Sequence, residues 1–446
     1  MGHQSDPHRD RRDFLWGVST SSYQIEGGAD EGGRGASIWD LFCRQPGRVA
    51  NGDTGEVACD HYHRYVEDVA LMRGLGIGAY RFSVAWPRVL PDGTGRVNEE
   101  GLAFYDRLID ALLEAEIEPW LCLYHWDLPQ ALHERGGWTE RDCAQWFADY
   151  AAVVARRTGD RVRRFATFNE PAVFTLFGYG FGAHPPGVGD RAACFKAIHN
   201  VNLAHGAAVD VIRANAPAAS IGGIHNVQPT LAASDAPEDQ AAARTYEALW
   251  NGAFPDPQML GCYPAAIADE MAPLILTDDL ARIRRPVDWF GLNHYAPNYI
   301  KADDRYALGM SFAAPPAALP QTSIGWTIEP DAFRDTLHYV GARYRLPIYV
   351  LENGTAAFDQ VDAAGIVDDP GRIDFLRRYT DAMHAAIAAG ADVRGYFVWS
   401  LMDNFEWTWG YAQRFGLVHV DFATLKRTPK ASARWYAAMI RTSRTR

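Results

Sequence analysis

Short apolar runs rich in β-forming residues alternate with longer runs of helical periodicity along almost all of the 446-residue chain. This alternation restricts the fold more than any other feature, because strands that are separated by helices form βαβ units around a parallel sheet. Eight runs predict strands, at residues 14–19, 79–83, 118–124, 162–168, 220–225, 289–293, 348–351 and 393–399.

The segments between these runs carry apolar residues at helical spacing, for example Tyr105, Leu108, Ile109 and Leu112. Length alone suggests about two or three average domains, but a (β/α)8 barrel with insertions passes 400 residues as one domain. We therefore predict an α/β protein, a (β/α)8 TIM barrel that forms a single domain with extended βα loops. The predicted domain covers residues 13–441, between a flexible N-terminal tail at 1–12 and a C-terminal tail at 442–446.

Composition narrows the range of partners. The formal net charge of −12 argues against a nucleic-acid or anionic-membrane partner, because most of the surface would repel either one. The six cysteines are scattered without a Cys-x-x-Cys pair, which predicts reduced and mostly buried thiols. No apolar run of about 18 residues and no secretory leader pattern occurs, so we predict a cytoplasmic protein and leave a homo-oligomer open.

Two glutamates each end a β-rich apolar run. Glu170 lies in Thr167-Phe-Asn-Glu-Pro, and Glu352 lies in Val350-Leu-Glu-Asn-Gly. In a parallel barrel, ligands bind where strands end in loops. Pro171 biases Glu170 toward extended geometry, so we expect the strand conformation to persist through this carboxylate. Two carboxylates at one rim are what glycoside hydrolysis requires.

Polar and aromatic residues follow the other strands at the same predicted end. A pyranose offers hydroxyls at its edge and C–H groups on its faces, so amides, carboxylates and aromatic rings together suit it. Taken singly, each such tryptophan or histidine is more often a core residue, but their joint placement favours a sugar pocket. The candidates are Gln24, Arg81, Trp86, His125, Trp126, Asn169, Asn293, Tyr295, Trp399, Glu406 and Trp407.

One other segment, Asp60-His-Tyr-His63, offers three metal-ligand types side by side. It leads into a predicted helix, where histidines two apart point to different faces, and two-carboxylate hydrolysis needs no metal. We therefore predict no metal and no cofactor.

The chain resembles glycoside hydrolase family 1, the β-glucosidase family, over nearly its full length. The resemblance rests on the order of Tyr23-Gln-Ile-Glu-Gly, Arg81-Phe-Ser, Tyr124-His-Trp-Asp-Leu-Pro, Thr167-Phe-Asn-Glu-Pro, Asn293-His-Tyr, Glu352-Asn-Gly and Asp403-Asn-Phe-Glu-Trp. It implies that Glu170 is the general acid/base and Glu352 the nucleophile of a retaining mechanism, with Arg81 and Tyr295 beside the nucleophile.

The resemblance also implies a set of substrate contacts and a stacking platform, Trp399, for the non-reducing sugar. The implied or predicted substrate-binding residues are Gln24, His125, Trp126, Asn169, Asn293, Trp326, Trp399, Glu406, Trp407 and Phe415. Chemistry supports the two catalytic roles. Arg81 and Tyr295 can keep a buried Glu352 ionised, and desolvation together with the charge of Glu352 can keep Glu170 protonated. Retention requires the two carboxyl groups to lie roughly 5–5.5 Å apart.

The implied function is a retaining β-glucosidase that releases terminal non-reducing β-D-glucosyl residues from oligosaccharides and from aryl or alkyl glucosides. Such an enzyme acts on small carbohydrates and contributes to cellulose and polysaccharide degradation. One alternative is a 6-phospho-β-glycosidase, but Glu406 stands in place of that group's serine and would repel a phosphate. A non-catalytic sugar-binding relative is the other alternative, and the presence of both glutamates disfavours it.

Three positions depart from the usual family pattern. Leu351 replaces a threonine before the nucleophile, and we expect it to point away from Glu352 because strand neighbours alternate. Ala172 replaces a tryptophan, which predicts a wider leaving-group subsite with Phe177 and Trp326 as an apolar wall. Trp409 replaces a smaller or acidic residue and is predicted to alter the rim of that subsite.

Overall fold

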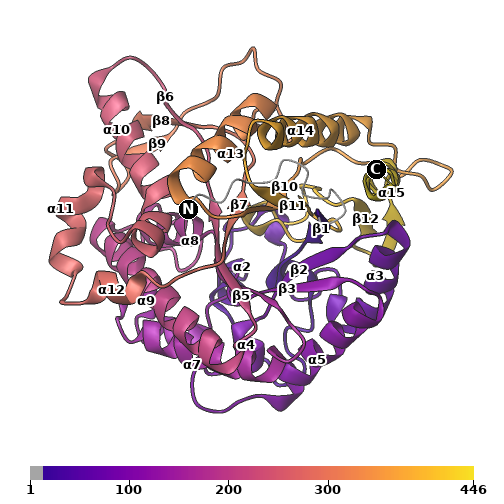
Figure 1. Ribbon diagram of the computed structural model, residues 1–446, viewed down its shortest axis with the longest axis horizontal. Coiled ribbons are helices and arrows are strands. Elements are labelled where there is room, and N and C mark those ends of the chain that lie inside the picture. Colours follow the sequence, from indigo (N-terminus) through magenta and orange to yellow (C-terminus); the bar gives the residue numbers. More distant parts are fainter. Residues whose placement is uncertain (1–13, 446) are drawn as a thin grey trace, which may run out of the picture.

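The computed structural model describes residues 14–445, in which eight parallel strands close into a barrel in the order β1-β11-β10-β7-β5-β4-β3-β2. The strands lie at the centre of the molecule and the helices surround them (Figure 1). This confirms the predicted (β/α)8 barrel, and every predicted strand is present with its ends shifted by at most a few residues. The barrel strands are β1 (Leu15–Ser19), β2 (Ala79–Ser83), β3 (Glu118–Cys122), β4 (Arg164–Asn169), β5 (Ser220–Asn226), β7 (Trp289–Asn293), β10 (Ile348–Asn353) and β11 (Val393–Trp399).

Most of the long helices pack around the barrel with their apolar faces inward, and the four residues that predicted the helix at 99–114 are all buried. The long helices are α3 (His61–Leu75), α5 (Glu99–Glu114), α7 (Cys143–Thr158), α9 (Arg191–Asn215), α10 (Pro237–Glu247), α13 (Pro330–Tyr344), α14 (Pro370–Ala388) and α15 (Ala431–Thr445). Short helices lie in the loops: α1 (Ser22–Ile25), α2 (Ile38–Cys43), α4 (Trp86–Val89), α6 (Gln130–His133), α8 (Pro171–Thr175), α11 (Ala268–Met271) and α12 (Asp279–Ile283).

Two small sheets complete the loops. One joins β6 (Thr230–Ala232), β8 (Asn298–Ala302) and β9 (Met310–Phe312), and the other is the hairpin of β12 (Val418–Asp421) and β13 (Lys426–Pro429). No helix within residues 14–445 is both long enough and apolar enough to span a membrane.

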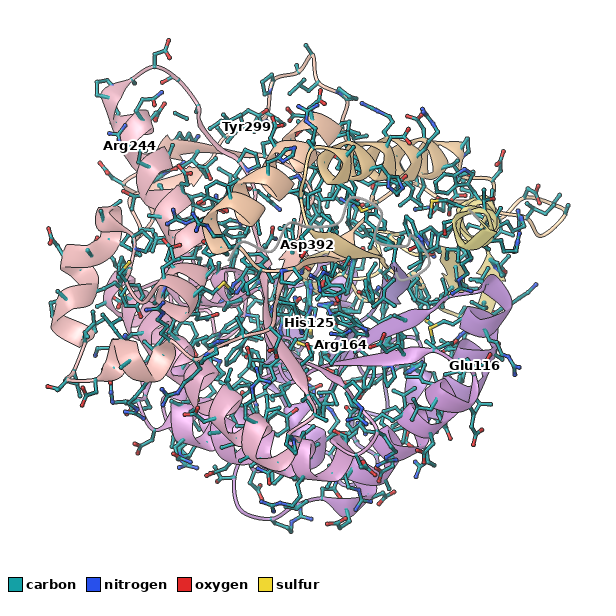
Figure 2. All side chains as sticks on the ribbon, viewed as in Figure 1. Glu116, His125, Arg164, Arg244, Tyr299 and Asp392 are labelled. Atoms are coloured by element: carbon teal, nitrogen blue, oxygen red, sulfur yellow. The ribbon has the colours of Figure 1, made fainter. Side chains whose placement is uncertain are left out.

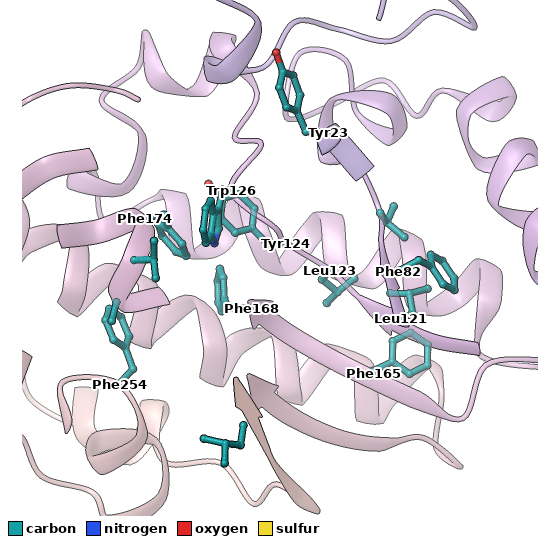
Figure 3. Packing of buried hydrophobic residues seen from close by; sticks show 14 of the residues in the cluster. Tyr23, Phe82, Leu121, Leu123, Tyr124, Trp126, Phe165, Phe168, Phe174 and Phe254 are labelled. Carbon is teal, nitrogen blue, oxygen red and sulfur yellow. The ribbon is translucent and has the colours of Figure 1, made fainter. Parts of the chain in front are cut away.

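Aromatic side chains fill the core on both sides of the barrel wall. Inside, the ring of Trp120 lies 4.7 Å from that of Tyr349 and 5.3 Å from those of Trp289 and Phe397. Outside, strand residues such as Phe168 pack with rings from neighbouring elements (Figure 3). Because the inner rings fill the interior of the barrel, they form a closely packed layer that supports the side chains at its carboxyl end.

Irregular pairing occurs where β4 and β10 approach the two glutamates. The pairing of β10 with β7 runs from Val350↔Leu292 to Glu352↔Asn293, which leaves one extra residue in β10, a β-bulge. Leu351 therefore packs inside the barrel although Glu352 also points inward to Arg81. The expectation that these neighbours point to opposite sides is wrong, because the bulge interrupts the alternation. In β4 the register shifts in the same way between Ala166 and Asn169.

Of the two predicted domain limits, only the C-terminal one falls among the described residues. The predicted N-terminal tail, residues 1–12, lies outside the described residues. At the other end α15 continues to Thr445, so residues 442–445 belong to a helix that begins inside the predicted domain. The cysteines are free, and all but the exposed Cys262 are buried.

Candidate active site

A cavity of about 450 Å³ opens at the carboxyl end of the barrel. His125, which lines it, lies near the centre of the molecule, whereas Glu116 and Arg244 lie at the periphery (Figure 2). Four predicted residues do not line the cavity but hold those that do, or lie directly beside them: Gln24, Arg81, Asn169 and Asn293. The predicted residues that line it are His125, Trp126, Glu170, Tyr295, Trp326, Glu352, Trp399, Glu406, Trp407 and Phe415.

Trp86 is the one candidate from the strand ends that belongs elsewhere. Its ring stacks on Tyr150 at 4.9 Å, and its indole N–H donates to the carbonyl of Gly93. It is fully buried in α4 on the helix side of the sheet, so it is a core residue.

Glu352 is buried and surrounded by hydrogen-bond donors. Both terminal nitrogens of Arg81 lie 2.6 Å from its Oε1, and the Tyr295 hydroxyl donates to its Oε2 at 2.7 Å. Burial raises the pKa of Glu352, while Arg81 and Tyr295 oppose that rise by stabilising the carboxylate. These two residues are therefore placed as the sequence predicted, on the side chain they were expected to hold.

Glu170 has a different environment. Its Oε1 accepts one hydrogen bond from Asn293 Nδ2 at 2.8 Å, and no arginine pairs with it among the described residues. Burial, and then the charge of Glu352, raise the pKa of Glu170 well above its ordinary value. The two carboxyl groups are thus held in opposed settings, since Glu352 is paired directly with a cation and Glu170 is not.

The backbone at Glu170 differs from the prediction. Its φ of 48° and ψ of 61° lie in the left-handed region, where it caps the N-terminus of α8, so the expected extended conformation is wrong. Pro171 disfavours the right-handed α conformation at the preceding residue, but it does not impose an extended one. The left-handed turn lets β4 pass into a helix within one residue, and strain of this kind is found at functional sites.

Asn169 links the two sides of the pocket. Its Oδ1 accepts hydrogen bonds from Arg81 and, at 3.1 Å, from Asn293, and its amide nitrogen lies 3.2 Å from His125 Nε2. With Nε2 as acceptor, the proton of His125 is assigned to Nδ1, which has no partner in the described protein. Burial lowers the pKa of His125 well below its ordinary value, so the ring is a neutral donor beside the cavity.

Gln24 and Glu406 close the inner end. Gln24 Nε2 donates to the carbonyl of Phe405 at 2.8 Å and lies 3.5 Å from Glu406 Oε2. Burial, and then the charge of Glu352, raise the pKa of Glu406 to about 8. The rings of Trp399 and Trp407 lie nearly parallel to the ring of His125, with centroids 5.9 and 5.8 Å away.

The outer end is apolar. Trp326, predicted as a wall residue, and Trp409, predicted at the rim, both line the cavity and are 38% and 49% exposed. Sequence reasoning identified Phe177 but missed other lining residues, among them Val173, Trp250 and Phe312. Val173 and Phe177 follow Glu170 by three and seven residues, a helical spacing that could have identified Val173.

Ala172 is not part of this wall. It is buried in the core and does not line the cavity, because it lies on another face of α8 from Val173. The prediction that position 172 shapes the leaving-group subsite is therefore not supported.

The Asp60–His63 segment has protein partners. His61 Nδ1 bonds to Asp68, and His63 bonds to Asp60 and Glu31. Residues 14–445 contain no group of three His, Cys, Asp or Glu side chains arranged to hold a metal ion.

Residues 7–445 match the sequence profile of Glycosyl hydrolase family 1. The chain belongs to this family. Among its relatives, Beta-glucosidase A of Thermotoga maritima is 45% identical over 433 residues, which cover 96% of this chain and 97% of the relative. Two solved structures are similar to this family 1 protein. They are a psychrophilic beta-glucosidase from Micrococcus antarcticus (TM-score 0.93, 43% identity, 100% of both chains) and the Thermotoga maritima enzyme in complex with glucoimidazole (TM-score 0.91, 43% identity, 97% of this chain and 98% of that chain).

Proposed function

We propose that the protein is a retaining β-glucosidase that releases terminal non-reducing β-D-glucosyl residues from oligosaccharides and from aryl or alkyl glucosides. The observation that carries this proposal is the pair of buried carboxyl groups in opposed settings. Glu352 is held by Arg81 and Tyr295, whereas the pKa of Glu170 is raised well above its ordinary value. Relatives named as beta-glucosidases, which match over nearly their whole length, support the same activity.

In the first step Glu352 attacks the anomeric carbon while Glu170 gives its proton to the glycosidic oxygen. The bond to the leaving group breaks, and a glycosyl ester forms on Glu352. Ester formation removes the charge of Glu352, so the pKa of Glu170 falls. Glu170 then takes a proton from water, which attacks the same carbon and restores the free carboxylate of Glu352.

The inner-end residues provide the sugar contacts in this proposal. His125, Gln24, Asn169 and Glu406 offer donors and acceptors to the hydroxyls, with Glu406 beside the 6-hydroxyl. The rings of Trp399 and Trp407 flank the site as apolar surfaces. Trp126 and Asn293 support this set, since they hydrogen-bond to Asn169 and to Glu170.

The test is a panel of nitrophenyl β-glycosides with NMR detection of the first-formed anomer. We expect the glucoside to be cleaved with β-glucose appearing first. α-Glucose as the first product would exclude a retaining mechanism, and no turnover of any β-glycoside would exclude the activity.

The alternative activity is that of a 6-phospho-β-glycosidase, which acts on 6-phosphorylated glycosides. Phe415 lines the cavity, but its neighbour in the sequence, Arg414, does not. Arg414 is paired with Asp403 at 2.7 Å, which argues against a role in binding a phosphate. Glu406 supplies no cation for a 6-phosphate, and above its pKa of about 8 it would repel one. We expect strong preference for the unphosphorylated glucoside, and equal turnover of both would overturn this assignment. A role in cellulose degradation and a cytoplasmic location stay predictions, and a homo-oligomer stays open.

A further inference from the structure

Six buried or partly buried charged residues form a cluster behind the pocket that the proposed mechanism does not use. We call it the Lys430 cluster; it consists of Asp359, Asp369, Arg372, Asp403, Arg414 and Lys430. Lys430 is fully buried, and its ammonium nitrogen lies 2.5 Å from Asp359 and 2.7 Å from Asp403. Three cations balance three anions, so the removal of one leaves an uncompensated charge.

Asp403 closes the loop that follows β11. Its carboxylate accepts hydrogen bonds from Lys430, from Arg414 at 2.7 Å and from the backbone N–H of Gly416 at 3.0 Å. Glu406 and Trp407 lie between these two ends of the loop. Both ends are therefore fixed on one carboxylate.

The same cluster binds this loop to the loop that follows β10 and Glu352. Arg372 pairs with Asp359 at 2.7 Å and donates to the carbonyl of Arg414 at 2.8 Å. The backbone N–H of Ala357 donates to that carbonyl at 3.2 Å. Nearer the pocket, a Cβ at Gly354 would lie 1.9 Å from the carbonyl oxygen of Trp399, so the two loops touch there.

Besides a hydrogen bond from the side chain of Trp399 to its carboxyl group, Glu406 has few contacts outside its own loop. Its backbone N–H donates to the carbonyl of Gly410 within the same loop, and Gln24 is 3.5 Å from its carboxylate. Its position therefore depends on how the loop is anchored. We propose that Lys430 is a positioning residue for the sugar pocket, which acts through Asp403 to hold the loop of Glu406 and Trp407 against the loop that follows Glu352. This inference rests on the proposed role of Glu406 in binding the 6-hydroxyl.

The test is Lys430→Met, which removes the ammonium and leaves two carboxylates facing each other. KM and kcat are measured with nitrophenyl β-glucoside and with its 6-deoxy analogue, which lacks the hydroxyl next to Glu406. We expect kcat/KM for the glucoside to fall about 10- to 100-fold, mainly through KM, because a small displacement of a contacting group has effects of this size. The 6-deoxy analogue should lose much less.

Two further variants separate positioning from general destabilisation. Arg343→Met breaks another ion pair, with the buried Asp256 at 2.6 Å, and neither residue lines the pocket. It should lower Tm and leave the ratio of kcat/KM values for glucoside and 6-deoxy analogue unchanged. In Lys430→Met/Asp359→Asn, one of the facing carboxylates is neutral, so Tm should partly recover.

If Lys430→Met yields no folded protein, the double variant is measured against the same criterion. An unchanged substrate ratio in a folded Lys430 variant would overturn the inference. Wild-type turnover of the β-glucoside reports on the proposed function separately.

Discussion

The inner and outer ends of the pocket are built in different ways. At the inner end, Gln24, Glu406 and Trp407 lie outside the barrel strands, but the residues that hold the nucleophile side lie within them, and each of these is nearly or fully buried: Arg81, Asn169, Asn293, Glu352 and Trp399. At the outer end, the wall comes from loops and short elements, and several of its rings are more than a third exposed. They are Phe312 (41%), Trp326 (38%) and Trp409 (49%).

This difference separates reaction chemistry from leaving-group choice. Within the described cavity lining, the acidic side chains are Glu170, Glu352 and Glu406, and all three belong to the inner end. A change at the outer end should therefore alter which aglycones bind without altering bond cleavage. A change at an inner-end sugar contact should affect every glucoside alike, whereas a change at Glu170 should depend on whether the leaving group needs a proton.

The largest effect is expected from removal of the nucleophile. Glu352→Ala should lower kcat by a factor on the order of 10⁴ to 10⁶, as the loss of covalent nucleophiles does elsewhere. Added azide should then give the α-glycosyl azide, because the anion attacks from the face that Glu352 occupied. Glu170→Ala with an activated aryl glucoside should instead give the β-azide. The same anomer from both variants would contradict the assignment of roles.

Loss of the acid/base, Glu170, should reduce the rate less than loss of the nucleophile, and it should change the pH dependence of the rate. Glu170 must be protonated for the first step, and its pKa is raised, so the rate should fall as pH rises through that pKa. Glu170→Gln should lower kcat/KM by about 10²- to 10⁴-fold for poor leaving groups. With a leaving group that needs no proton, the alkaline limb should disappear. Survival of that limb in pH-rate measurements would mean that another group is the acid.

An inner-end sugar contact should have an intermediate effect. Above pH 8, where Glu406 is ionised, Glu406→Gln should reduce kcat/KM for the glucoside about 10- to 150-fold, the range of a hydrogen bond to a charged group. The 6-deoxy analogue should be affected less, while methyl, phenylethyl and nitrophenyl glucosides should be affected equally. An effect that depends on the leaving group would place Glu406 at the outer end.

The smallest effect is expected at the outer wall. Phe177 stacks on Phe312 with centroids 5.7 Å apart, and Phe177→Ala removes this ring pair, worth about 0.5–1.5 kcal/mol. We expect kcat/KM for 2-phenylethyl β-glucoside to fall about 2- to 12-fold, with methyl β-glucoside unchanged. Phe358→Ala is the control, because that ring is 80% exposed and does not line the pocket. A loss for the methyl glucoside as well would mean that the two ends are not independent.

The barrel and the inner end could be predicted from sequence because they depend on local signals. Strand patterns fix where Glu170 and Glu352 fall, and Arg81 and Tyr295 were placed by their motifs. The residues of the outer end are harder to predict from sequence. Trp250 and Phe312 reach the cavity through tertiary packing of loops, and no regular spacing in the sequence links them. The left-handed backbone of Glu170 and the inward direction of Leu351 were mispredicted, because single-residue irregularities leave no periodic signal.

The bulges that precede the two glutamates limit how this site can change. Substitution replaces a side chain but leaves its place along the strand unchanged, whereas gain or loss of one residue shifts it. Deletion of Leu351 would restore regular alternation in β10 and place Glu352 at the position that now faces the barrel core. The position of the nucleophile thus depends on the number of residues in its strand as well as on its hydrogen-bond partners. Insertions or deletions should therefore be far less tolerated here than in the outer loops.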